Sequence, residues 1–467
     1  MKFFSVFLIF ALGVSAAAQS RRVVPTIPAA GGERPVKEMF DEANSYRKLK
    51  FEEFEAKKVP VNERLRGQTE REQKQLAAKF AATAADRAEL TADDTYYLAL
   101  LYWISDNLDG TSETLRKYLA SEGRKPERSQ TSRSLLAVVS AKQKRFDEAA
   151  AALAEYSKNE PTKPSEKLRM NSEMAKAYLA AGEQAKAIPY ATEAFAISRS
   201  LITDPSMRSV GLDLVYDNAM VLFDAQRLSN EVTGAEGTLG ELRKTAASLG
   251  SSVYYFQAAD KLITYRIETG RKPLALETYL SMLIAAGKEL PLDGQRQDAM
   301  KRLRKREKHY KLLGESAPEL TSVDKWFPGN TVRMADLKGK VVLIDFWATW
   351  CAPCFEAFPS LIEWHDELSD QSFVILGFTR YYGRDESRPV DEAGEIAFLE
   401  RFKSKQKLPY DFVVGKDQST QLLYGATALP TAVLIDRKGI IRYIEPGTST
   451  SRLAEMREMI LKLLAEK

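Results

Sequence analysis

Apolar and polar positions follow a helical pattern over about half of this chain. From residue 70 to residue 312, Ala, Leu, Glu, Lys and Gln dominate, and the period-two alternation typical of strands is absent. Turn-forming residues interrupt the pattern, for example at Asp109-Gly110, Glu160-Pro161 and Thr269-Gly270. We therefore expect residues 70–312 to form an all-α domain of successive helices.

The pattern changes after residue 312, where short apolar runs alternate with helix-like stretches. The expected strands are residues 341–346, 373–378, 412–414, 431–436 and 440–445, and the expected helices are residues 355–365, 396–405, 419–424 and 451–465. A polar insertion occupies residues 381–395. This order predicts that residues 313–467 form an α/β domain, a mixed sheet with helices on both faces.

The N-terminal segment has the pattern of an export signal. Met1-Lys2 is basic, residues 3–14 are apolar, and residues 15–18 are small. We interpret residues 1–18 as a cleaved signal peptide, with an uncleaved membrane anchor as the alternative. Residues 19–69 are expected to be a flexible, partly helical linker. The protein is therefore expected to be extracytoplasmic, secreted or periplasmic, and membrane-associated if the segment is retained.

Composition narrows the choice of function. The chain has 68 Lys and Arg against 64 Asp and Glu, a net charge of only +4, so nothing favours a nucleic-acid partner. A basic run at residues 302–311 is interpreted as a solvated helix end or an interdomain joint. The two histidines, His309 and His365, do not form a zinc-ligand spacing with the cysteines, so no metal is expected.

Cys351 and Cys354 are the only cysteines in the chain. They lie between an expected buried strand and an expected helix, where unpaired N–H groups and the helix dipole lower the pKa of a thiol. A thiolate attacks disulfides, and a second thiol three residues later can resolve the mixed disulfide. A purely structural bridge is the alternative, but its loop of about four residues would contribute only about 2 kcal/mol.

A weak internal repeat runs through the helical domain. Phe146-Asp-Glu-Ala149-Ala150 aligns with Gln184-Ala-Lys-Ala187-Ile188 at a period of 38, and Gly182 precedes Ala187 as Gly270 precedes Ala275. These positions resemble the tetratricopeptide repeat, with a generic helical bundle as the alternative. The resemblance implies a concave surface for a protein or peptide ligand.

The last third of the chain resembles the thioredoxin fold. The motifs are Gly314-x-x-Ala317-Pro318, Leu337-x-Gly339-Lys340, Phe346-Trp-Ala-Thr-Trp350-Cys351-Ala-Pro-Cys354 and Leu429-Pro430-Thr431. More narrowly, they resemble the exported thiol–disulfide oxidoreductases of the TlpA/ResA type. The resemblance implies an extracytoplasmic disulfide reductase that acts on protein disulfides without a cofactor and takes electrons from a membrane thiol donor.

The resemblance also implies residue roles. Cys351 is expected to be the exposed nucleophile and Cys354 the resolving thiol. Asp345 is expected to be a buried proton shuttle, with a solvent-facing strand-end acid as the alternative. Trp350 is expected to shield the rim of the site. Pro430 matches a cis-proline that lets the backbone of Leu429 pair with a substrate strand.

One position departs from the ResA pattern. ResA-type proteins carry a Glu three residues after the second cysteine, where this chain has Ala357. Glu356 is one position earlier, which turns its side chain by about 100° on a helix, so we do not expect it to replace that Glu.

Two other functions stay open. The first is a thiol peroxidase, which is disfavoured because Ala348, rather than a Thr, lies three residues before Cys351. The second is a helical binding scaffold with an accessory redox domain.

Overall fold

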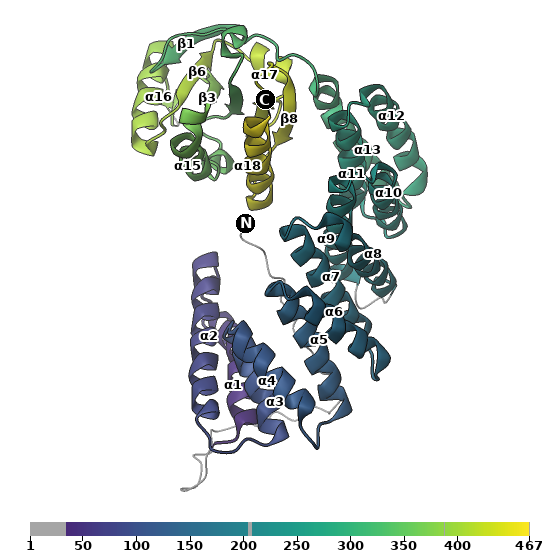
Figure 1. Ribbon diagram of the computed structural model, residues 1–467. Helices are drawn as coiled ribbons and strands as arrows, with labels where there is room; N and C mark the ends of the chain where they lie inside the picture. Colours follow the sequence, from purple (N-terminus) through teal and green to yellow (C-terminus); the bar gives the residue numbers. More distant parts are fainter. Residues whose placement is uncertain (1–33, 204–207, 387, 467) are drawn as a thin grey trace. The chain divides into compact units, whose positions relative to one another are not determined.

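The computed structural model describes residues 34–203, 208–386 and 388–466. The expected signal peptide therefore lies outside the described residues. The chain divides into two compact units, one ending at Thr245 and the other running from Ala246 to the C-terminal helix. Each unit is described separately below, with its elements labelled in Figure 1.

The first unit is built of helices, as the sequence predicts. Its helices are α1 (Val36–Ala56), α2 (Glu63–Ala85), α3 (Ala92–Ile104), α4 (Leu108–Ala120), α5 (Pro126–Lys142), α6 (Phe146–Lys158), α7 (Pro164–Ala180), α8 (Gln184–Leu201), α9 (Arg208–Leu228) and α10 (Val232–Ser248), the last of which crosses the boundary between the units. Consecutive helices are joined by short turns, so each apolar stripe is buried against its neighbours.

The segment expected to be a linker contains ordered helices. Helix α1 lies wholly within it, and α2 crosses the boundary expected at residue 70. Met39 and Ala43 of α1 share a buried cluster with Ala77 and Ala81 of α2. Small alanine side chains let the two helices approach closely, so this segment is more tightly packed than its charge density suggests.

Aligned positions of the weak repeat have the same local structure in both segments. Helices α6 and α8 begin at the two aligned segments, and Ala149 and Ala187 are fully buried. Gly182 and Gly270 both have positive φ, at 75° and 76°, which glycine adopts without strain. Membership in the tetratricopeptide class stays a prediction.

The second unit has a mixed sheet, as the sequence predicts, with six strands instead of the five expected above. Its strands are β1 (Val323–Phe327), β2 (Val341–Phe346), β3 (Phe373–Arg380), β6 (Asp411–Gly415), β7 (Thr431–Ile435) and β8 (Ile441–Pro446), in the order β1-β6-β3-β2-β7-β8. Strand β2 is parallel to β3 and antiparallel to β7. A separate pair, β4 (Arg384–Asp385) and β5 (Arg388–Pro389), forms within the polar insertion.

Alternate residues of β2 point to two different cores. Val341 and Leu343 belong to a cluster with residues of α15 (Phe358–Leu368), α16 (Glu392–Gln406) and α18 (Thr450–Ala465). Val342 and Ile344 belong to the other cluster, with α11 (Ser252–Glu268), α12 (Lys272–Glu289), α13 (Asp293–Leu312) and α17 (Ser419–Tyr424). Figure 1 shows α15, α16, α17 and α18 beside the strands. Both faces are thus covered, which explains the continuous apolar run of β2.

Helix α13 belongs to the second unit, although it lies before residue 313, where the α/β domain was expected to begin. The basic run at residues 302–311 contains a buried arginine, Arg306. Its guanidinium donates to Asp260 Oδ1 and to the carbonyl of Ile444, each at 2.9 Å. His309 Nε2 lies 2.8 Å from the carbonyl of Gly425. The run is therefore a joint between helices and sheet, the second of the two interpretations above.

The helix expected after the cysteines is interrupted. A short helix, α14, spans Ala352–Phe355, and α15 begins only at Phe358. Pro359 lies in the first turn of α15, where its missing N–H is tolerated, but a continuous helix would place its ring against the preceding turn. The prediction of one helix over residues 355–365 is wrong at this point.

Across the described parts of the chain, none of the helices has both the length and the apolar character needed to span a bilayer.

Candidate active site

The two cysteines lie at the corner between β2 and α14. Cys351 occupies the N-cap position of α14, and Cys354 lies within that helix. Their sulfur atoms are joined in a disulfide, and the N–H of Cys354 donates to the carbonyl of Cys351 at 2.9 Å. Strand β2 ends just before this corner, and the first turn of α14 brings the two sulfur atoms together.

Cys351 is less accessible than the sequence predicts. In this disulfide form it is 3% exposed and Cys354 is fully buried. Both lie in the buried cluster that also contains Trp347 and Phe358. The expectation of an exposed Cys351 is therefore wrong for the oxidised state, whereas its role as nucleophile stays a prediction.

Asp345 lies inside the protein, beneath this corner. It follows Val341 and Leu343 on the same face of β2 and pairs with Gly377 of β3 and Ala432 of β7. It is 4% exposed, and burial raises the pKa of its carboxyl group to about 7. Within the described chain its Oδ2 atom makes no hydrogen bond. The alternative of a solvent-facing acid is thus excluded, and the carboxyl group is suited to exchanging protons near neutral pH.

Gly377 allows two aromatic residues to approach Asp345. A Cβ atom at Gly377 would lie 3.1 Å from Tyr410 Cε2 and 3.2 Å from Trp347 Nε1, closer than ordinary contacts. Burial, and secondarily the charge of Asp345, raises the pKa of Tyr410 well above its usual value. Tyr410 therefore stays neutral beside Asp345.

The predicted cis-proline segment lies at the same site. The Leu429–Pro430 peptide bond is cis, Pro430 is buried, and Leu429 packs partly buried against both cores. The carbonyl of Pro430 accepts a hydrogen bond of 2.7 Å from the N–H of Gly447. In the described residues the main-chain N–H and C=O of Leu429 make no hydrogen bond, so both are available to another strand.

Trp350 forms the exposed rim of the site. It is 50% exposed and meets the ring of Tyr382 edge to face at 5.4 Å. The guanidinium of Arg380 covers the Tyr382 ring at 4.3 Å. The buried carboxylate of Glu395 accepts hydrogen bonds from the N–H groups of Tyr382 and Gly383. The polar insertion is thus fastened beside Trp350.

A small cavity lies where the ResA-type Glu would be expected. It measures about 10 Å³, and its wall includes Asp345, Ala357, Pro430 and Thr448. Ala357 is buried and Glu356 is exposed, so Glu356 does not occupy the place of that Glu. Ala357 donates its N–H to the carbonyl of Cys354 at 3.2 Å, so the cavity adjoins the turn that carries the resolving cysteine.

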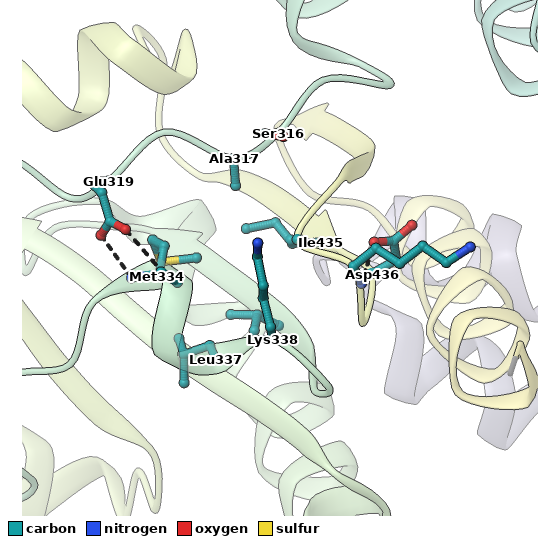
Figure 2. A pocket seen from close by; sticks show the side chains of 12 residues that line it. Ser316, Ala317, Glu319, Met334, Leu337, Lys338, Ile435 and Asp436 are labelled. Atoms are coloured by element: carbon teal, nitrogen blue, oxygen red, sulfur yellow. Dashed lines mark hydrogen bonds between the residues drawn. The ribbon is translucent and has the colours of Figure 1, made fainter.

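A larger pocket lies toward the opposite end of β2. It measures about 200 Å³ and is lined by Val342 rather than Asp345 (Figure 2). The Glu319 carboxylate accepts from the N–H groups of Met334 and Ala335, as the dashed lines show. None of the cysteine-site residues lines this pocket, so it is separate from the candidate active site.

No metal centre emerges from the described ranges, because they hold no group of three His, Cys, Asp or Glu side chains able to bind an ion. His309 is engaged with Arg306 and Gly425, and His365 lies beside Asp366. The reactive groups described at this corner are the two sulfurs and the Asp345 carboxyl group.

Several residues at the site carry no recognisable sequence signal. Tyr382 and Glu395 lie at the ends of the polar insertion, and Tyr410 and Thr448 lie in segments without a motif. Their place at the site follows from sheet pairing and loop packing, which local sequence does not show. Glu395 lies just before the helix expected at residues 396–405. From the sequence alone it resembles an ordinary acid at a helix N-terminus, although the structure buries it.

Comparisons with known proteins place the C-terminal third in context. The sequence profile of the AhpC/TSA family matches residues 313–444. The thioredoxin-like protein YneN of Bacillus subtilis is 30% identical over 145 residues, which cover 31% of this chain and 77% of YneN. The thiol–disulfide oxidoreductase ResA of Geobacillus thermodenitrificans is 30% identical over 138 residues, covering 30% of this chain and 71% of ResA. A solved structure of a putative thiol:disulfide interchange protein DsbE from Chlorobium tepidum is 26% identical, with a TM-score of 0.27, and covers 33% of this chain and 98% of that one.

Proposed function

The C-terminal third of this chain belongs to the thioredoxin-like thiol–disulfide oxidoreductases, and from this premise we propose that the protein reduces protein disulfides outside the cytoplasm. Cys351 is the attacking sulfur and Cys354 the resolving sulfur. The observation that carries the proposal is the cysteine pair at the start of α14 with the buried Asp345 carboxyl group beneath it.

The first step uses the reduced protein. The Cys351 thiolate attacks one sulfur of a substrate disulfide, the substrate S–S bond breaks, and the released substrate thiolate takes a proton from solvent. A substrate strand pairs with the free main-chain groups of Leu429, which holds its disulfide near Cys351. Trp350 and Tyr382 contact the substrate at the rim.

The second step completes the transfer of two electrons. The Cys354 thiol gives its proton to the Asp345 carboxylate, and the resulting thiolate attacks Cys351 Sγ. The Cys351–Cys354 bond forms, the bond to the substrate breaks, and the substrate leaves as a dithiol after taking a second proton. Because the pKa of Asp345 is about 7, its carboxyl group accepts this proton and releases it again near neutral pH.

Location and partners follow from the same interpretation. The basic and apolar start of the chain supports export, and an exported reductase needs an outside source of electrons, which we assign to a membrane thiol donor. The helical domain is assigned the binding of a protein or peptide client. These assignments rest on the sequence pattern and on the helical packing of residues 36–248.

The test uses the full-length protein after reduction with dithiothreitol and removal of the reductant. Each protein molecule should reduce one disulfide of a model protein, and Cys351→Ser should abolish this reaction. Cys354→Ser should instead accumulate a mixed disulfide through Cys351, visible by mass. If Cys351→Ser retains the activity, the proposal is wrong.

A further inference from the structure

Two buried polar atoms face the small cavity beside the cysteines. Asp345 Oδ2 and Thr448 Oγ1 are both inaccessible to solvent and have no hydrogen-bond partner within the described chain. Both residues line the same cavity of about 10 Å³. Unpartnered buried oxygens are uncommon in folded proteins, because each loses its hydrogen bonds to water without replacement.

We propose that this cavity holds one water molecule that bridges Asp345 Oδ2 and Thr448 Oγ1, and that Thr448 is a positioning residue for proton release from Asp345. The cavity has about the volume that a single water requires, and two polar atoms reach it. The role of Thr448 in proton release rests on the proposed function, whereas the water site does not depend on that function.

The walls of the cavity limit what it can hold. Leu343, Leu361, Leu453 and Met456 supply apolar surface, and the small side chain of Ala357 leaves the space open. The volume is too small for a substrate side chain. A single water satisfies both oxygens, donating to the Asp345 carboxylate and accepting from the Thr448 hydroxyl.

The loop that carries Thr448 lines the cavity and continues into exposed residues. It joins β8 to α18, and its Gly447 N–H is fastened to the carbonyl of Pro430 at 2.7 Å. The next residue, Ser449, is exposed and caps α18 by accepting from the N–H of Arg452 at 3.3 Å. The cavity therefore adjoins a residue, Thr448, whose neighbour in the chain is at the protein surface.

The bridge also affects the acidity of Asp345. A hydrogen bond donated to the carboxylate favours the ionised form, so it holds the pKa below the value that burial alone would give. Removing the hydroxyl of Thr448 loosens the water and should raise that pKa. The proton that Cys354 delivers would then leave Asp345 more slowly at neutral pH.

The test compares three full-length variants. Thr448→Val removes the hydroxyl at nearly constant volume, Thr448→Ser keeps it, and Thr450→Val makes the same change at an exposed position two residues away. The pKa of Asp345 is read from its carboxyl carbonyl band by infrared difference spectroscopy of the oxidised protein, with Asp345→Asn to assign the band.

Thr448→Val should raise the pKa of Asp345 by about one unit, a tenfold change in its ionisation equilibrium. The rate of mixed-disulfide resolution at pH 7 should fall about fivefold, because the ionised fraction of Asp345 falls from about one half to about one tenth, and the pH profile of that rate should move up by about one unit. Thr448→Ser should restore both values, and Thr450→Val should change neither.

An unchanged Asp345 pKa in Thr448→Val would overturn the inference. So would an equal shift in Thr450→Val, or a failure of Thr448→Ser to restore the wild-type value in folded protein. The spectroscopic measurement needs no substrate. If the wild-type protein reduces no disulfide but Thr448→Val still shifts the pKa, the proposed function fails while the water site stands.

Discussion

Replacing Asp345 with Asn should make the protein more stable at alkaline pH while impairing its chemistry. Burial raises the pKa of Asp345 from 3.8 to about 7. Between these values the folded chain keeps the Asp345 proton while the unfolded chain has released it, so stability falls as pH rises. Above about pH 7 both states have lost the proton, and the loss of stability is complete.

The size of the effect follows from the same two values. A rise from 3.8 to about 7 corresponds to roughly 4 kcal/mol, because each pKa unit equals about 1.4 kcal/mol. Asn has the shape of the protonated acid and never ionises. We therefore expect Asp345→Asn to match the wild-type protein near pH 4 and to exceed its free energy of unfolding by about 2 to 4 kcal/mol near pH 8.

Urea unfolding of the oxidised protein at several pH values measures this difference. Tryptophan fluorescence is a suitable signal, since Trp326, Trp347, Trp350 and Trp364 all lie in the sheet domain. The exposed Asp370→Asn serves as the matched control and should not reproduce the pH-dependent gain. A difference between Asp345→Asn and wild type that stays constant from about pH 4 to about pH 8 would refute the reasoning.

Three further changes test the surroundings of the site. Arg306→Met should lower the free energy of unfolding by about 3 kcal/mol, because it leaves Asp260 without its buried cation; an unchanged urea midpoint would contradict this. Trp350→Ala should raise KM for a protein disulfide about tenfold and leave stability nearly unchanged, since Trp350 is half exposed; equal kinetics would remove it from the rim. Glu395→Gln should speed amide hydrogen exchange at Tyr382 and Gly383 about tenfold, by weakening charge-assisted hydrogen bonds, and unchanged exchange would show that the insertion is held otherwise.

Local sequence patterns predicted most of the sheet domain, although not the break in the helix after the cysteines. The apolar run at residues 341–346 forms the central strand β2, and the hairpin expected near residues 431–445 forms β7 and β8. These predictions succeed because buried strands and tight turns depend on residues close together in the chain. The cysteine spacing marked the site in the same way, whereas the cis-proline was expected from the resemblance to the thioredoxin fold.

What the sequence did not show depends on packing between distant segments. In the basic run at residues 302–311 several cations look alike, yet only Arg306 among the arginines is buried, because it shares a face of α13 with Leu303 and Tyr310. Cys351 is buried in a cluster whose members come from several elements far apart in the sequence. Thr448 lines the same cavity as Asp345 because the β8–α18 loop is bonded to the cis-proline segment through Gly447.

The reduction potential of the Cys351–Cys354 pair tests the central claim most directly. The full-length protein is equilibrated with glutathione buffers, and the fraction of reduced cysteines is read by alkylation and mass. A disulfide reductase should have a potential more negative than about −240 mV, near the value of about −270 mV known for thioredoxin. A potential near about −120 mV, as in strongly oxidising proteins of this fold, would contradict the account.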